Sequence, residues 1–109
     1  MINISFQDAP LHDLCVDLER AEQMFGSVSA AALVNFISEA DAFENVQELI
    51  DFLGGDLEVS VDDSIFVAIG ADYRATFVVV GTRFNRDDHG RIVWESVTRL
   101  KLVEISRWP

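Results

Sequence analysis

The feature that most constrains the fold of this chain is a pair of apolar runs within residues 64–81. Residues 64–70 and 73–81 are rich in β-branched and aromatic side chains, and a Gly-Ala-Asp break at 70–72 separates them. Two such runs around a short break are typical of a hairpin in the middle of a sheet. Arg74 stands among residues that should be buried, where a charge is costly unless it is paired or used. We therefore expect a central hairpin and treat Arg74 as the first candidate functional residue.

Upstream of this hairpin, the apolar residues recur with a helical period. A short strand over residues 2–6 should lead to Asp8, a suitable helix N-cap, and an amphipathic helix should run from Leu11 to about Gly26. A second helix should start at Ser27 or Ser29, and a third, shorter one should span residues 42–53. The sequence therefore predicts two or three helices after one short strand.

Downstream of residue 56, the apolar period changes to two. Alternation over residues 57–61 predicts a strand, residues 82–91 read as a polar loop, and residues 92–105 form a long β-rich run. The order predicts an α+β fold, with the helices on one face of an antiparallel sheet of about four main strands. We expect residues 1–109 to be a single domain. Its core should include Leu18, Phe36, Val67, Ile69, Phe77, Val79, Leu100 and Leu102.

Charge is distributed unevenly along the chain. Residues 1–63 hold 14 acids and one base, Arg20, whereas residues 64–109 hold 5 acids and 7 bases, which together give the net charge of −11. So acidic a chain argues against simple phosphate-driven binding of nucleic acid. No apolar run reaches the roughly 20 residues that span a membrane, and we expect neither a signal peptide nor a membrane partner. The lone Cys15 forms no intrachain disulfide, so we expect a cytoplasmic protein.

Three stretches resemble the RelE/ParE superfamily of bacterial toxins, in particular its HigB-like "plasmid maintenance killer" branch. Residues 1–6, with the helix from Leu11, resemble the opening strand and first helix of that family. Residues 72–77 (Asp-Tyr-Arg-Ala-Thr-Phe) resemble its Tyr-Arg-x-x-Phe strand. Residues 90–98 (Gly-Arg-Ile-Val-Trp-Glu-Ser-Val-Thr), continued to Glu104-Ile105, resemble its closing strand and are the most specific of the three.

The resemblance implies a toxin–antitoxin protein. Family members cut messenger RNA on the ribosome without a metal or other cofactor, or attack gyrase, and an antitoxin partner silences them. In the nucleases, basic and aromatic side chains polarise the phosphate, activate the 2′-hydroxyl and protonate the leaving group. The resemblance places Arg74 on the scissile phosphate, with Tyr73 beside it and Arg107 near a C-terminal basic position. These three are the expected catalytic residues.

The strand before the hairpin departs from the family pattern. Family nucleases usually carry lysines or arginines there, whereas residues 55–60 read Gly-Asp-Leu-Glu-Val-Ser and contain no base. Lost cations and added carboxylates should repel RNA. We therefore expect weakened or lost ribonuclease activity.

The loop before the last strand offers nucleic-acid-binding candidates. Arg83, Arg86, His89 and Arg91 lie close to Phe84, and such a mixture can pair with phosphates and stack on bases. Ordinary solvated loop charges are the alternative. Likewise, Trp94 and Trp108 suit packing better than base stacking.

A metal site has little support in the sequence. His12 and Cys15 are three residues apart and could share a helix face, yet no second pair of ligands accompanies them. We therefore expect no metal, with Cys15 in the core and His12 at the surface.

Two classes of function remain open. One is a toxin-like, ribosome-directed endoribonuclease, and the other is a non-catalytic protein-binding module on the same scaffold. The acidic helical half and the base-free strand favour the second class. An antitoxin-like protein partner suits both classes, ribosome or messenger RNA suits only the first, and a homo-oligomer is a further alternative.

Overall fold

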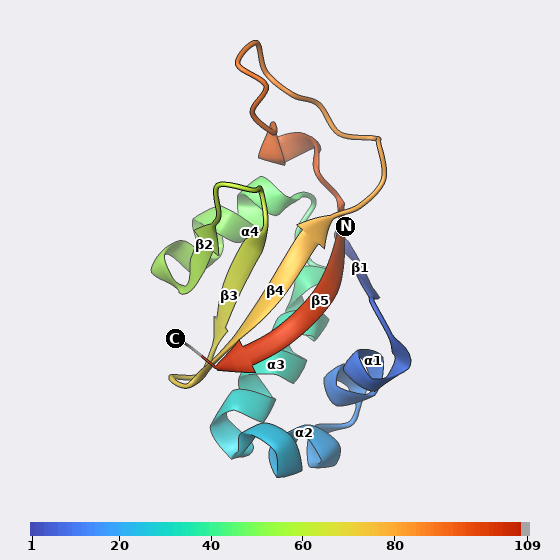
Figure 1. The fold of residues 1–109 in the computed structure, drawn as a ribbon, viewed down its shortest axis with the longest axis vertical. Helices are drawn as coiled ribbons and strands as arrows, with labels where there is room; N and C mark the ends of the chain where they lie inside the picture. The colour runs from blue at the N-terminus through green and yellow to red at the C-terminus, as the bar shows by residue number, and fades with distance from the viewer. Residues whose placement is uncertain (108–109) are drawn as a thin grey trace.

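The computed structural model describes residues 1–107, and Trp108 lies outside the described residues. Figure 1 shows one sheet in front of a layer of helices. In chain order the elements are β1 (Asn3–Phe6), α1 (Ala9–Val16), α2 (Leu18–Phe25), α3 (Ser27–Ala40), α4 (Val46–Leu53), the short helix η1 (Gly54–Asp56), β2 (Leu57–Val59), β3 (Ile65–Ile69), β4 (Tyr73–Val79), the short helix η2 (Trp94–Ser96) and β5 (Arg99–Arg107). The α+β class predicted from the sequence is confirmed.

The sheet has five strands in the order β1-β5-β4-β3-β2. The pairs β2–β3, β3–β4 and β4–β5 are antiparallel, as expected. The edge pair β1–β5 is parallel, with Asn3 opposite Arg99 and Phe6 opposite Leu102. The expected antiparallel sheet of about four strands is therefore correct for the strands after the helices, and β1 adds a fifth strand that runs parallel to its neighbour β5.

The central hairpin forms as predicted. β3 and β4 pair from Ile65 opposite Phe77 to Ile69 opposite Tyr73, and residues 70–72 make the turn. Gly70 has a φ of +76°, a conformation that glycine adopts at little cost. The β3 side chains alternate between buried and partly buried, so one face of the hairpin belongs to the core.

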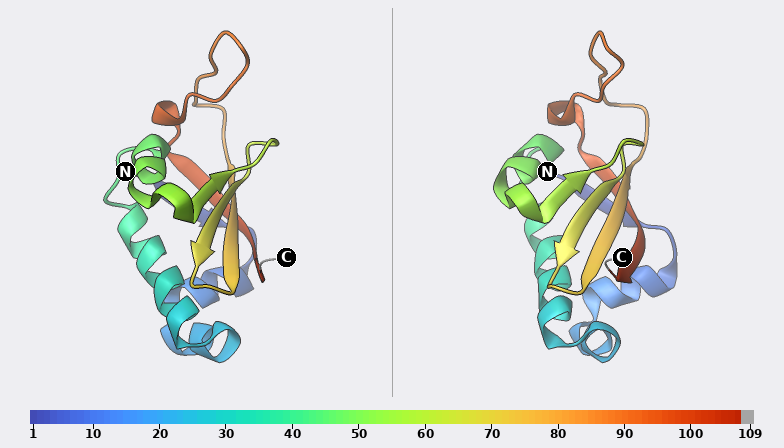
Figure 2. Two further views of the ribbon diagram at one scale, coloured as in Figure 1. Left: turned by 90° about the vertical axis from the view of Figure 1, so that its left-hand side faces the viewer. Right: turned by 60° about the vertical axis from the view of Figure 1, so that its left-hand side comes forward.

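All the α-helices cover the same face of the sheet (Figure 2), which confirms that part of the prediction. The core between them centres on fully buried Leu33, Phe77 and Leu100, with Phe36 tilted against Phe77 at a ring-centroid distance of 5.4 Å. Val79 is only partly buried, at the edge of this core. Among residues 1–107, no helix covers the other face of the sheet.

The first predicted helix is in fact two. Asp17 adopts an extended conformation, and its carboxylate accepts a hydrogen bond from the Arg20 N–H at 3.2 Å, so it acts as the N-cap of α2. The break turns Leu18 outward, and it is 44% exposed. The prediction of Leu18 as a core residue was therefore wrong, whereas Asp8 caps α1 as expected.

Two other boundaries differ from the prediction. The third predicted helix begins at Val46 instead of residue 42, because Asn45 caps its N-terminus by accepting from the Glu48 N–H. The run predicted as a long strand at 92–105 is a strand only from Arg99. Residues 92–98 are not part of the strand. Ser96 connects them to the start of the loop, since its hydroxyl donates to the Val93 carbonyl and accepts from the Asn85 N–H.

Within residues 1–107, no helix combines the length and the apolar character that crossing a bilayer requires.

Candidate functional site

Arg74 lies on the face of the sheet that no helix covers. It pairs with Ala68 on β3 and with Ser106 on β5, and its guanidinium carbon lies 4.3 Å above the centre of the Phe66 ring. A guanidinium over an aromatic face is attracted by the ring quadrupole. The stacking explains how a charge is accommodated in a central strand, and it places Arg74 on a surface that a partner can reach.

Tyr73 and Arg107 lie on the opposite face, because successive strand residues point to opposite sides. The two are cross-strand neighbours, and the Arg107 guanidinium lies 5.4 Å from the Tyr73 ring centre. The Tyr73 ring also makes an edge contact of 4.9 Å with Phe25 of α2. The three residues expected to act together in catalysis are therefore divided between two faces, and Tyr73 acts in packing.

The loop candidates lie at the other end of β4. Residues 80–98 connect β4 to β5 and project beyond the sheet (Figure 1). Val80 lies six positions after Arg74 along an extended segment, which corresponds to about 20 Å. Arg74 and the loop arginines thus belong to different regions.

Within the loop, Asp87 organises the tip. Its carboxylate accepts hydrogen bonds from the N–H groups of His89 and Arg91, at 2.9 and 3.0 Å. Arg86 donates to the Gly90 carbonyl at 2.9 Å and lies 3.8 Å from the Asp63 carboxylate. These contacts give Arg86 a structural role and leave the His89 and Arg91 side chains exposed.

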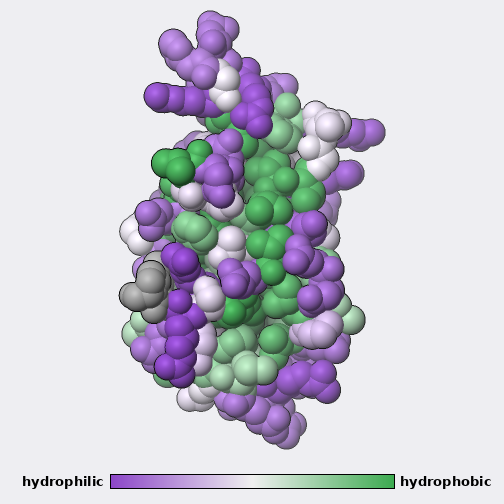
Figure 3. Space-filling view, in the orientation of Figure 1, coloured by the Kyte–Doolittle hydropathy of each residue, from purple (hydrophilic) through white to green (hydrophobic). Residues whose placement is uncertain are grey.

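The uncovered face carries a band of apolar surface. Figure 3 shows it running along the middle of the sheet, bordered by polar residues. Strand alternation and register assign to it the partly buried side chains Phe66, Ala68, Val78 and Val103. At a β-bulge after Thr76, both Val103 and Glu104 face this side. We call this surface, with Arg74 and Thr76, the open face.

Thr76 lies at the centre of the open face with its hydroxyl unsatisfied. The residue is 8% exposed, and its Oγ1 atom has no hydrogen-bond partner among residues 1–107. A buried hydroxyl without a partner costs about 1 to 3 kcal/mol. Sequence reasoning missed both Phe66 and Thr76, although the same period of two that placed Val67 and Phe77 in the core puts them on the other face.

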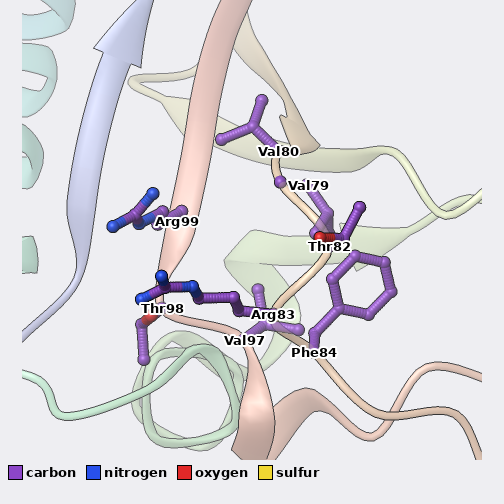
Figure 4. A pocket seen from close by; sticks show the side chains of 9 residues that line it. Val79, Val80, Thr82, Arg83, Phe84, Val97, Thr98 and Arg99 are labelled. Carbon is purple, nitrogen blue, oxygen red and sulfur yellow. The ribbon is translucent and has the colours of Figure 1, made fainter.

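A cavity of about 160 Å³ lies where β4 ends and β5 begins. Arg83 and Arg99 line it, and both side chains extend to the same side across the start of β5 (Figure 4). Buried Val97 and partly buried Val79 and Phe84 form its apolar part. Sequence reasoning selected Arg83 but missed Arg99, because only the fold brings residue 99 beside the loop.

His12 and Cys15 do not form a metal site. Among residues 1–107, no cluster of three or more metal-ligating side chains is present. The His12 ring makes an edge contact with Phe6 at 5.1 Å and lies 3.5 Å from the Asp13 carboxylate. Cys15 is 2% exposed, and burial raises the pKa of its thiol to about 12, so it is an inert core residue.

Comparison with known proteins returned no matching family model, no matching curated protein and no matching solved structure.

Proposed function

We propose that this chain is a toxin–antitoxin-type protein, resembling the HigB-like branch of the RelE/ParE superfamily, that acts by binding a protein partner over the open face. The observation that carries the proposal is the open face itself. It combines an apolar band with a buried, unsatisfied hydroxyl on a sheet whose other side is fully used for the core. Apolar surface rimmed by polar groups marks sites of protein association.

Charge indicates what kind of partner fits. Five charged residues lie on the open face: Arg74, Arg99, Lys101, Glu58 and Glu104. Cations thus outnumber carboxylates by three to two, the reverse of the whole chain with its 8 bases and 19 acids. A partner segment that alternates apolar and acidic residues would cover the band and pair with the cations. Such a segment suits the antitoxin-like partner that the resemblance implies.

A non-catalytic role is supported by the division of the expected catalytic residues. Arg74 faces the open side, whereas Tyr73 contacts Phe25 and Arg107 on the helix side. General acid–base chemistry requires its groups within hydrogen-bond reach of one substrate. Glu58 adds a carboxylate to the open face where an RNA chain would lie.

A metal-independent endoribonuclease is the second candidate. It is favoured by Arg74 and Lys101, two cations on the open face that could contact phosphates of a bound message. The two candidates differ in what Arg74 contacts, which is a carboxylate in one and a phosphate in the other.

The test identifies the partner and then measures its binding. A photo-crosslinking residue replaces Val78 at the middle of the open face, the protein is expressed in a bacterial host, and the crosslinked protein is identified by mass spectrometry. Its affinity is then measured by calorimetry for the wild type and for Phe66→Ala, Arg74→Glu and Phe52→Ala. Phe52 is the matched control, since it is an aromatic residue 65% exposed on α4, on the other side of the sheet.

We expect Phe66→Ala and Arg74→Glu to weaken binding at least tenfold, and Phe52→Ala to change it less than twofold. Equal losses in all three variants would contradict binding at the open face. Growth and messenger-RNA integrity are followed in the same cells. Growth arrest with message cleavage that Arg74→Ala abolishes would establish the nuclease instead.

A further inference from the structure

The cavity at the end of β4 has the properties of an anion site. Its rim carries two guanidinium groups, Arg83 and Arg99, and two hydroxyl-bearing residues, Thr82 and Thr98, all exposed. Figure 4 shows both guanidinium groups on the same side of β5. We call it the Arg83–Arg99 pocket.

Neither arginine is neutralised by the protein. Within residues 1–107, the Arg83 and Arg99 side chains make no hydrogen bond and no ion pair, whereas Arg20 and Arg86 each lie near a carboxylate. Two like charges at one small cavity repel each other. Both guanidinium groups are therefore available to an anionic ligand, which would supply their counter-charge.

The backbone of the same loop supplies further donors. The N–H groups of residues 81–84 donate no hydrogen bond to any acceptor within the described part of the chain, although the neighbouring Val80 and Asn85 N–H groups do. Gly81 has a φ of +82°, and residues with positive φ occur in the backbone concavities that bind anions. The residues that line the cavity therefore carry both guanidinium groups and backbone N–H groups without a partner among the described residues.

The size of the cavity and its surroundings limit the ligand. About 160 Å³ is below the roughly 300 Å³ at which pockets for whole drug-sized ligands begin, and it suits a single compact group. A second hollow of about 300 Å³ adjoins it, sharing Val80 and Arg99, and is further lined by Asn3, Ile4 and Ser5 of β1. An anionic group in the first hollow would leave the rest of its molecule over the second.

We propose that the Arg83–Arg99 pocket binds the phosphate of a small phosphate monoester, with its sugar or nucleoside part over Asn3 and Ser5. Arginine is suited to phosphate because its planar fork matches two phosphate oxygens. The ligand is a single phosphate and not a polymer, because the net charge of −11 repels a polyanion and only two arginines reach the site. The pocket shares Arg99 with the charged rim of the open face but includes neither Phe66 nor Arg74, so the titration below tests it without the partner proposed above.

The test is a titration of the ¹⁵N-labelled protein followed by NMR, with inorganic phosphate, ribose 5-phosphate, adenosine 5′-monophosphate and a single-stranded RNA 12-mer as probes. The variants are Arg83→Gln and Arg99→Gln. Arg20→Gln is the control, since it removes the same charge from exposed α2, away from the pocket. Both pocket arginines are exposed and unpaired among the described residues, so their variants should fold, and thermal unfolding checks this.

We expect the monoesters to shift the amide signals of residues 81–84 and to bind at least tenfold more tightly than inorganic phosphate. Only the monoesters should also shift the signals of residues 3–5. Each pocket variant should weaken monoester binding about tenfold or more, and Arg20→Gln less than twofold. Any of three results would overturn the proposal: no shift at residues 81–84, equal weakening by Arg20→Gln, or tighter binding of the RNA 12-mer than of adenosine 5′-monophosphate.

Discussion

At the scale of single residues, the buried Cys15 thiol should make the stability of the protein depend on pH. Burial raises the pKa of its thiol from 9.0 to about 12. Between these values the folded thiol keeps its proton while the unfolded thiol loses it, so the unfolded state binds fewer protons and stability falls as pH rises. The free energy of unfolding of the wild type should fall relative to Cys15→Ala by up to about 1.4 kcal/mol per pH unit above 9.0.

Urea unfolding of both proteins from pH 8 to 10.5 measures this difference. The contributions of all other titrating groups to the pH dependence cancel in this comparison, because both proteins contain them. Parallel pH profiles would show that the Cys15 thiol is already accessible in the folded state.

Gly70 is a second position at which a single added atom, a Cβ, should change the stability of the protein. A Cβ at Gly70 would lie 2.5 Å from the Ser29 hydroxyl and 3.3 Å from the Ser29 Cα of α3, on a backbone with positive φ. Gly70→Ala should destabilise by about 2 to 4 kcal/mol, from the left-handed conformation and the overlap together. Gly90→Ala is the control, since φ is +77° there and the space is open, and it should cost about 1 to 2 kcal/mol.

Thermal or urea unfolding separates the two effects at Gly70. Equal losses in the two variants would mean that α3 shifts away at no cost, and that this helix is not held tightly against the turn.

At the scale of elements, the break between α1 and α2 depends on one side chain. Asp17 ends α1 and caps α2 through the Arg20 N–H. Asp17→Ala should destabilise the protein by about 0.5 to 2 kcal/mol, whereas Asp17→Asn, which keeps a capping oxygen, should lose less. Chemical unfolding measures both variants. A gain in stability for the alanine variant would indicate that the two helices prefer to merge.

The same break shows what the sequence could and could not reveal. The apolar period near 3.6 located the helices, and alternation located β3 and β4, because in both cases the spacing of apolar residues along the chain determines which side chains are buried. Asp17 also fits the polar side of one continuous helix, so periodicity alone could not detect its role as a cap. The cap decides the position of Leu18, whose exposure was therefore mispredicted.

The candidate site was predictable only in part, for a similar reason. Sequence patterns selected Arg74 as a charge within an apolar run and Arg83 as a cation beside Phe84 in the polar loop. The parallel pairing of β1 with β5 joins segments far apart in the chain, and no local signal indicates it. That pairing places Asn3 opposite Arg99 and so builds the hollow beside Arg83.

At the scale of the whole molecule, the excess charge sits on the helix-rich half of the chain. Residues 1–63 carry 14 acids and one base, and α2 has no basic residue in its last turn. Glu22→Lys should stabilise the protein by about 0.3 to 1 kcal/mol at low salt, since it relieves repulsion and complements the helix dipole.

This gain should fade in 0.5 M NaCl, because salt screens exposed charges. Glu104→Lys is the control, as it adds a cation to the open face and should give no gain. Urea unfolding at two salt concentrations tests both variants. A gain from Glu22→Lys that persists at high salt would show that repulsion is not its source.

The position of β5 has a consequence for how the chain folds as it is synthesised. β5 lies between β1 and β4, yet it follows every other strand along the chain. When the first strand and all the α-helices have left the ribosome, β1 still has no neighbour to pair with, and Leu100 and Leu102 have not yet joined the core. Contacts between such distant segments slow folding and prolong the exposure of apolar surface. The sheet of the nascent chain therefore cannot be completed until residues 99–107 have been synthesised, and the apolar residues of β1 stay without their strand partner for that interval.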